Sequence, residues 1–123
     1  MIVHAHRDAP FECCGLLIGD GDRINETRPA RNVLASPIRF LVDPADHFAA
    51  VRAARAQNAS IVGAYHAHPK RPATPSETDV AEWPWESCLY VIVSLEGSSA
   101  EVRAWRRNDG RVQEVRLLVD ERT

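Results

Sequence analysis

The sequence contains no long apolar run and few cysteines. No segment approaches the roughly 18 consecutive apolar residues of a membrane-spanning helix, and the start MIVHAHRDAP lacks the basic-then-apolar order of a secretory signal. The three cysteines are an odd number, and Cys13 and Cys14 are adjacent, so a disulfide framework is not expected. We therefore predict a cytoplasmic location, no membrane partner, and thiols that pack as small apolar groups.

A strong excess of one charge is also absent. Fifteen Lys and Arg stand against 17 Asp and Glu, for a formal net charge of −2, and the basic residues are scattered along the chain. This pattern does not predict a nucleic-acid partner. The length of 123 residues and the composition, 45% hydrophobic and 26% charged, are typical of a globular protein, so we expect one domain over residues 1–123.

Apolar runs separated by turn residues predict an α/β domain with a mixed sheet. Asp43 and Pro44 suit the start of a helix, and Asp109-Gly110 is typical of a hairpin turn. The expected helices cover residues 1–12, 44–58 and a short stretch that starts near residue 76. The expected strands cover residues 14–18, 23–29, 39–42, 60–66, 89–95, 100–107 and 112–119.

The most informative segment begins at the end of the expected strand 60–66. His66 and His68 are two residues apart, and side chains two apart on a strand point the same way, so they can share one metal ion. A catalytic zinc typically has three protein ligands and a water in the fourth position. Asp79, one turn into the following helix, is the candidate for the third ligand.

Part of this pattern has a structural explanation. Ser76 and Asp79 have the spacing of a capping box, in which a serine side chain satisfies a free amide at a helix start. Taken alone, that spacing favours capping. Its combination with the two histidines just upstream favours a metal site.

The order His66-x-His68-Pro69, a spacer, and then Ser76-x-x-Asp79 resembles the motif of the JAMM/MPN-domain zinc metalloproteases, which include deubiquitinating enzymes and compact bacterial relatives. That family also has a glutamate upstream, at the end of its first helix, and Glu12 in the segment ECCGLLIG matches it. The resemblance covers most of the chain. It implies the JAMM/MPN fold, which is related to cytidine deaminases and has a mixed, curved sheet flanked by helices.

The resemblance also implies roles for these residues. His66, His68 and Asp79 would hold one Zn²⁺ ion, and Glu12 would move a proton from the attacking water to the leaving amine. Ser76 would donate a hydrogen bond to the developing oxyanion. Where the family has Ser or Thr between the two histidines, this chain has Ala67, which removes a hydroxyl and predicts an altered but active site.

The compact bacterial relatives imply a substrate class. Only nine residues separate Asp79 from Leu89, which leaves no room for the long insertions of ubiquitin-directed relatives. We therefore expect hydrolysis of the amide bond after the Gly-Gly tail of a ubiquitin-like sulfur-carrier protein, with the tail extended beside an exposed strand.

Two other functions compete with this one. The first is a non-catalytic protein-interaction scaffold of the same fold, which the intact set of metal-ligand residues disfavours. The second is a zinc deaminase, but such enzymes need a Pro-Cys-x-x-Cys pair and a His-x-Glu, and neither occurs in the sequence.

The remaining candidates predict packing or surface roles. His4 and His6 also form a His-x-His, but on a helix they diverge by about 200°, so we expect surface residues. His47 is expected to face solvent or to cap its helix. Trp83 and Trp85 are expected either to pack in the core or to form a wall of the substrate groove.

Overall fold

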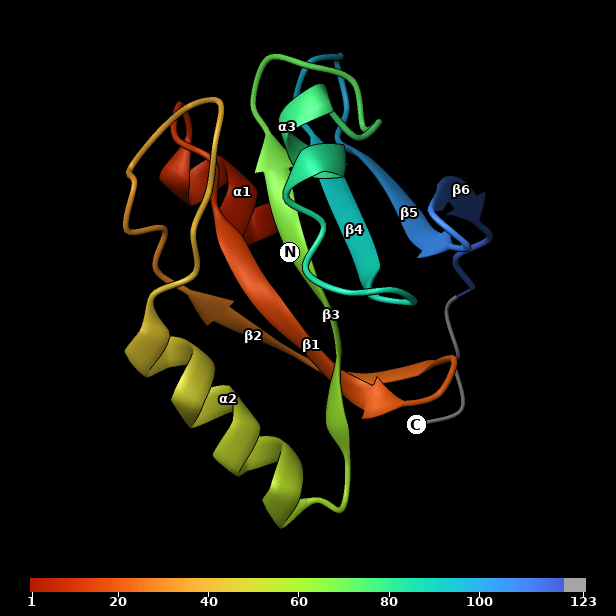
Figure 1. The fold of residues 1–123 in the computed structure, drawn as a ribbon. Helices are drawn as coiled ribbons and strands as arrows, with labels where there is room; N and C mark the ends of the chain where they lie inside the picture. Colours follow the sequence, from red (N-terminus) through yellow and green to blue (C-terminus); the bar gives the residue numbers. More distant parts are fainter. Residues whose placement is uncertain (119–123) are drawn as a thin grey trace.

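The structure is a computed structural model that describes residues 1–118. Its centre is one six-stranded mixed sheet with the strand order β2-β1-β3-β4-β5-β6, which confirms the expected fold class (Figure 1). The helices are α1 (Ile2–Asp8), α2 (Pro44–Ala56) and α3 (Glu77–Ala81), and the strands are β1 (Cys14–Asp20), β2 (Arg23–Ala30), β3 (Ser60–His68), β4 (Leu89–Ser94), β5 (Glu101–Asn108) and β6 (Arg111–Val115). Among residues 1–118, no helix has the length and apolar character needed to cross a bilayer.

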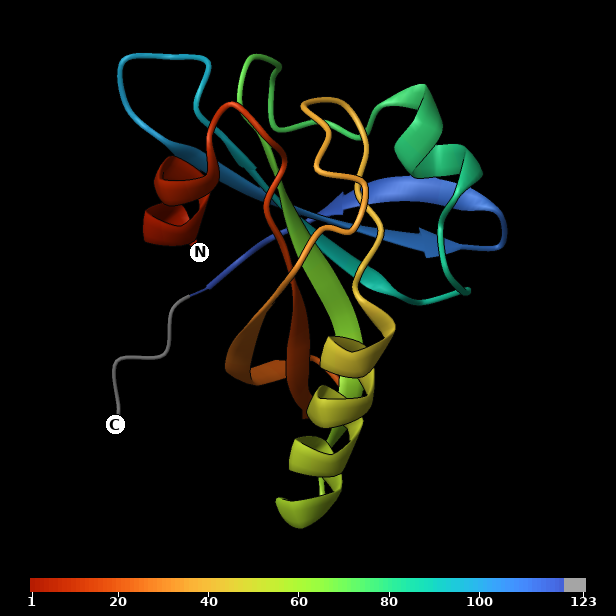
Figure 2. The same ribbon diagram turned by 90° about the vertical axis from the view of Figure 1, so that its left-hand side faces the viewer.

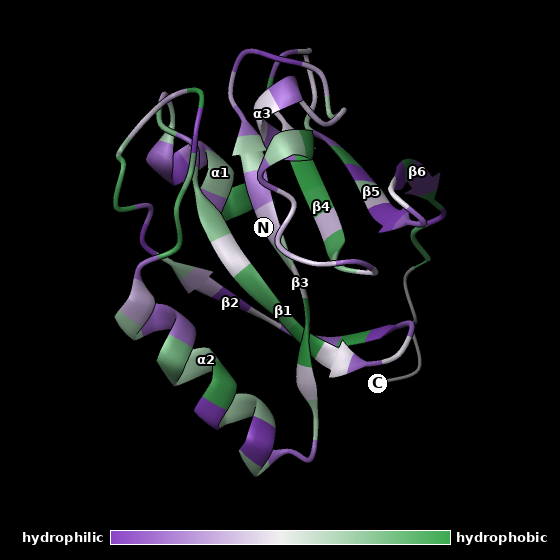
Figure 3. Ribbon diagram, in the orientation of Figure 1, coloured by the Kyte–Doolittle hydropathy of each residue, from purple (hydrophilic) through white to green (hydrophobic). Residues whose placement is uncertain are grey.

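The helices cover both faces of the sheet. Figure 2 shows α1 on one side and α2 and α3 on the other. Strands β1 and β4, in the middle of the sheet, are buried along almost their whole length and are rich in apolar residues (Figure 3). A near-continuous apolar run is expected of a strand covered on both faces. The sheet therefore has a core on each side.

The connection between β3 and β4 brings the site together. These two strands are parallel, whereas every other pair in the sheet is antiparallel. Parallel neighbours need a crossover connection, and here it consists of residues 69–88, including α3. The crossover places α3 on the sheet face to which His66 and His68 point, so Asp79 lies over the end of β3.

The expected end of the first helix is wrong. The helix expected over residues 1–12 ends at Asp8, and Ala9 is extended with φ −55° and ψ 141°. The cause is Pro10, because the residue before a proline is disfavoured in the helical region. Glu12 therefore lies on the link between α1 and β1 and not on a helix.

The strand expected over residues 39–42 is absent from the described structure, apart from one isolated bridge between Asn32 and Val42. The Asn32 side chain holds this segment as a loop, since it donates to the Arg39 carbonyl at 2.9 Å and accepts from the Leu41 amide at 2.9 Å. These contacts replace the ladder of bonds that a strand would need.

The strands at the site and at the C-terminal end also differ from expectation. β3 extends to His68, two residues further than expected, so both histidines belong to the strand. β6 ends at Val115, and the last expected strand residue, 119, lies outside the described residues.

Tyr65 links α1 to the sheet through a contact with His4, and the prediction for His4 is wrong. The phenol oxygen of Tyr65 lies 2.8 Å from His4 Nδ1, and His4 Nε2 lies 3.0 Å from an Asp8 carboxylate oxygen. His4 is buried, not on the surface as expected, because it faces the sheet from α1. Burial lowers the pKa of His4. His6 is exposed, as expected.

Gly15 makes this contact possible. It pairs with Tyr65 across β1 and β3, and a Cβ added at Gly15 would lie 2.1 Å from the Tyr65 ring. Because the Tyr65 ring is buried and its hydroxyl is hydrogen-bonded to His4, the ring has little room to move. We expect Gly15→Ala to lower the free energy of unfolding by about 1–3 kcal/mol, measured by chemical denaturation. Gly97→Ala is the matched control, since its added Cβ meets no atom closer than 3.7 Å. Equal stability of the two variants would contradict this packing account.

Candidate metal and catalytic site

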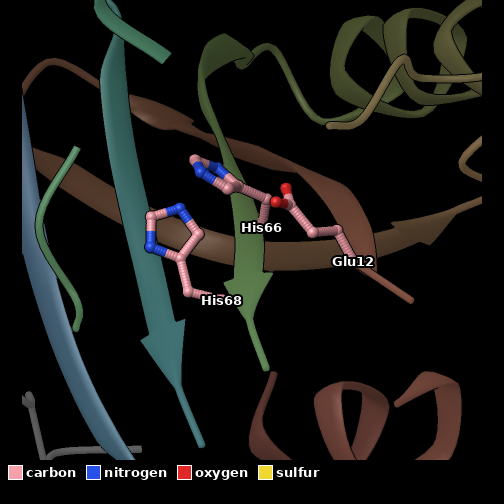
Figure 4. Close-up of side chains that lie close together, drawn as sticks. All are labelled: Glu12, His66 and His68. Carbon is pink, nitrogen blue, oxygen red and sulfur yellow. The ribbon is translucent and has the colours of Figure 1, made fainter. Parts of the chain in front are cut away.

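Four side chains from three parts of the chain meet at the end of β3. His66 and His68 come from β3, Asp79 from α3, and Glu12 from the link before β1, and all four are buried. One ligand atom of each of Glu12, His66 and His68 lies within 4.8 Å of the others. Figure 4 shows the Glu12 carboxylate beside the His66 ring, with both histidines on the same side of β3.

Asp79 joins this group and also caps its own helix. Its Oδ2 accepts a hydrogen bond from the Ser76 amide at 2.9 Å, and Ser76 Oγ accepts from the Asp79 amide at 3.0 Å, which completes the capping box. The same Oδ2 lies 3.0 Å from His68 Nε2 and 3.1 Å from His66 Nε2. Burial alone would raise the pKa of Asp79, but the contacts with the two imidazoles outweigh it and hold that pKa well below its usual range.

The partner of His68 Nδ1 determines which nitrogen faces the site. Nδ1 lies 2.8 Å from the Pro72 carbonyl, which can only accept, so Nδ1 carries the proton. In a neutral ring, Nε2 then presents a lone pair toward the Asp79 carboxylate. Two acceptors 3.0 Å apart need a cation or a second proton between them. This arrangement suits a metal ion.

His66 supplies the second nitrogen. Its ring stacks on Phe40 at 4.4 Å between centroids and meets the edge of Tyr90 at 5.1 Å. Burial lowers the pKa of His66, which favours the neutral ring that binds metals. Among the described residues, neither nitrogen of His66 has a hydrogen-bond partner, although Nε2 lies 3.1 Å from the Asp79 carboxylate.

The two carboxylate oxygens of Glu12 have different surroundings. Oε2 accepts a hydrogen bond of 2.6 Å from Arg71 Nη2, whereas Oε1 is buried and has no partner in the described part of the chain. Burial raises the pKa of Glu12 to about 7. The glutamate is thus fixed through one oxygen, and the other is available to a proton or a ligand.

The donor set fits a metal ion. Buried polar atoms are normally satisfied. Within residues 1–118, the buried side-chain nitrogen and oxygen atoms without a hydrogen-bond partner are Glu12 Oε1, His66 Nδ1 and His66 Nε2, and all of them belong to this cluster. Imidazole nitrogens with a carboxylate oxygen are the ligand types that zinc accepts. The cluster could therefore hold a metal ion.

A mainly apolar cleft of about 290 Å³ opens beside Asp79. Its walls include Phe40, Tyr90 and Trp85. The two alternatives for the tryptophans therefore both occur: Trp83 is buried in the core, and Trp85 is part of the cleft wall. Of the four buried side chains of the site, Asp79 is the one that lines this cleft.

Comparison with known proteins identifies the family. The family described as prokaryotic homologs of the JAB domain matches residues 1–108. The chain belongs to the prokaryotic JAB family. This confirms the JAMM/MPN prediction, and the match includes Glu12, Ser76 and every residue expected to hold metal.

Several known proteins are similar to this chain along most of its length. A desampylase of Pyrococcus furiosus is 33% identical over 123 residues, covering 97% of this chain and 84% of its own. A protein of Thermus thermophilus named "Probable TtuB-protein conjugate cleaving protease" is 38% identical, covering 95% and 74%. The CysO-cysteine peptidase of Mycobacterium tuberculosis is 35% identical, covering 93% and 80%.

Solved structures show the same JAB fold. A protein of Desulfitobacterium hafniense matches with a TM-score of 0.87 at 30% identity, over 98% of this chain and 86% of that one. A JAB1/MPN domain protein of Archaeoglobus fulgidus matches with a TM-score of 0.54 at 23% identity, over 92% and 83%, and supports the fold alone.

All five residues expected to form the site lie together, although their chemical roles stay predictions. Two residues next to the site, Arg71 and Phe40, are not predicted from the sequence. Arg71 is 59 residues from Glu12 in the sequence, and no spacing rule links them. Phe40 was assigned to a strand that does not form. Cys13 and Cys14 are free and buried, as expected, and His47 is exposed.

Proposed function

We propose that the protein is a zinc-dependent hydrolase that cleaves the amide bond after the Gly-Gly tail of a ubiquitin-like sulfur-carrier protein. His66, His68 and Asp79 would hold the zinc ion. The observation that carries the proposal is the cluster of buried acceptors without partners: His66 Nε2 and Glu12 Oε1 face the same space as the Asp79 carboxylate. Leaving such groups unsatisfied is costly unless something binds there.

The relatives support the substrate class. One is named for cleaving conjugates of the protein TtuB, another as a CysO-cysteine peptidase and a third as a desampylase. These names agree with the substrates that the JAMM resemblance implies. The proposed location is the cytoplasm, where the three free, buried cysteines would stay reduced.

The residues of the chain suit hydrolysis of an amide. A zinc ion in this site would polarise the scissile carbonyl and lower the pKa of a bound water to about 7. Glu12 Oε1 would take a proton from the attacking water as the water oxygen bonds to the carbonyl carbon. The same carboxyl group then delivers the proton to the amide nitrogen as the C–N bond breaks, which yields a carboxylate and an amine. A pKa near 7 suits a group that must both accept and release a proton.

Ser76 can cap α3 and assist the reaction at the same time. Its oxygen accepts from the Asp79 amide through a lone pair, so its hydroxyl hydrogen stays available for donation. That hydrogen would stabilise the oxyanion that develops on the scissile carbonyl. The mainly apolar cleft beside Asp79 would hold the tail, whose glycines have no side chains to hinder its entry.

Two substitutions of Ser76 separate its roles. Ser76→Gly is expected to lower the free energy of unfolding by only a few tenths of a kcal/mol, whereas Ser76→Ala lowers it by about 0.5–2 kcal/mol. Both remove the hydroxyl, so both should lower kcat by about 10²- to 10³-fold. Denaturation curves and kcat measured on the same preparations give the comparison. A Ser76→Gly enzyme with wild-type kcat would show that the Ser76 hydroxyl acts in capping and not in catalysis.

The proposal is tested by incubating the zinc-loaded protein with CysO-cysteine and with a TtuB-protein conjugate, and by following the products by mass spectrometry. Cleavage after the Gly-Gly tail that stops on chelation and returns with zinc is the expected result. A protein that binds zinc or a carrier but cleaves neither substrate would contradict hydrolysis, and carrier binding alone would favour the scaffold function.

A further inference from the structure

Arg71 is held beside Glu12 by a fixed loop. Residues 69–76 follow β3, and three of their carbonyls accept side-chain hydrogen bonds. Ser94 Oγ donates to the Arg71 carbonyl at 2.6 Å, Trp105 Nε1 donates to the Ala73 carbonyl at 2.9 Å, and His68 Nδ1 donates to the Pro72 carbonyl at 2.8 Å. These bonds hold the backbone of the loop at and next to Arg71.

Within residues 1–118, the Arg71 guanidinium makes hydrogen bonds through one of its nitrogens, Nη2. Its two hydrogen bonds within residues 1–118, to Glu12 Oε2 at 2.6 Å and to the Ile38 carbonyl at 3.4 Å, both come from Nη2. A guanidinium has five N–H donors, so those on Nε and Nη1 are left for another acceptor. The Arg71 side chain is 32% exposed, whereas that of Glu12 is fully buried, so Arg71 can meet a ligand from solvent.

The position of Glu12 fixes where the leaving group lies. To receive a proton from Glu12, the scissile nitrogen must come within about 2.6–3.2 Å of its carboxyl group. Arg71 Nη2 is 2.6 Å from the same group. A group attached to the scissile nitrogen can therefore come close to Arg71.

We propose that Arg71 binds the free α-carboxylate of a single amino acid leaving group, so that the protein prefers a carrier tail ending in Gly-Gly-amino acid over a tail joined to a lysine side chain. This inference rests on the proposed function and specifies its substrate. In an amino acid, the α-carboxylate is two bonds from the nitrogen, within reach of the free guanidinium edge. Arginine pairs with carboxylates through parallel hydrogen bonds, which suits this geometry.

An isopeptide offers no such partner. The nitrogen of a lysine side chain is attached to a methylene group, and the nearest carbonyl of that lysine is several bonds away. An amide in place of the α-carboxylate keeps the shape but removes the charge. Arg71 thus predicts an order of preference: acid first, then amide, then isopeptide.

The test uses three substrates with one common acyl group, either CysO or TtuB, whichever is cleaved faster. The first ends in cysteine with a free carboxylate, the second in cysteine carboxamide, and the third is joined to the side-chain nitrogen of Nα-acetyl-lysine amide. We expect kcat/KM for the acid to exceed that for the carboxamide by about 10- to 100-fold, the usual worth of a charged hydrogen bond. In Arg71→Gln this ratio should fall to near one.

The ratio of kcat/KM for the acid to kcat/KM for the carboxamide separates substrate recognition from support of Glu12. Loss of the Arg71–Glu12 contact lowers turnover of all three substrates alike and so leaves this ratio unchanged. Arg71→Lys, which keeps the charge, should restore part of the preference. Arg103→Gln is the matched control, because Arg103 also makes a 2.6 Å ion pair and is 32% exposed, but it lies on β5 and pairs with Glu114 on β6. A wild-type ratio near one, or a ratio unchanged in Arg71→Gln, would overturn the inference and leave hydrolysis intact. Failure to cleave any of the three would overturn the proposed function and this inference with it.

Discussion

Replacing Glu12 with glutamine is expected to lower kcat by about 10²- to 10⁴-fold, the usual contribution of a positioned acid or base. The glutamine amide cannot take up the proton of the attacking water at neutral pH. Its carbonyl oxygen can still accept the hydrogen bond that Arg71 Nη2 gives to Oε2, so the local structure should persist. The variant should also keep its zinc, since Glu12 is proposed to act on protons and not as a metal ligand.

The measurement is steady-state cleavage of a carrier substrate, with zinc content determined on the same samples. Glu114→Gln is a suitable control, because it neutralises another glutamate in a 2.6 Å ion pair with an arginine, far from β3. A Glu12→Gln enzyme that retains activity within a few-fold of wild type would exclude Glu12 as the group that moves the proton.

Replacing His68 with alanine is expected to abolish stable zinc binding. The substitution removes one of three proposed ligands and the Nδ1 bond to the Pro72 carbonyl. Loss of an outer-shell partner alone typically weakens metal binding by about 10- to 100-fold, and loss of a ligand should exceed that. Elemental analysis after gel filtration gives the zinc content per chain, and circular dichroism establishes whether the sheet is intact.

His6→Ala provides the control for this experiment. His6 is exposed on α1, so its loss should leave zinc content unchanged. A folded His68→Ala protein that retains wild-type zinc would contradict the proposed ligand set.

The candidate site can be predicted from the sequence because its proposed ligands follow local rules. His66 and His68 share a face because strand side chains alternate, and β3 indeed extends through both. The capping-box spacing predicts the start of α3 at Glu77, and Asp79 acts in the cap while it faces the histidines. Helix capping and metal binding, the two explanations for Ser76 and Asp79, are compatible, because a carboxylate can interact with several partners at once.

The features that the sequence does not predict depend on contacts between distant segments. Tyr65 buries His4 against the sheet only because Gly15 leaves space for its ring, and no helical pattern contains that information. The pairing of Arg71 with Glu12 likewise depends on the folded loop after β3. The loop around Phe40 resembles a strand in composition, yet the Asn32 side chain takes its backbone hydrogen bonds.

The most direct test of the account is the zinc content of the wild-type protein, purified without added metal and then titrated with zinc. The buried side chains of His66, His68 and Asp79 predict close to one tightly held zinc per chain, retained through gel filtration and required for cleavage of a Gly-Gly-tailed carrier. A folded protein that binds no zinc on titration would contradict the proposed site and the hydrolysis that depends on it.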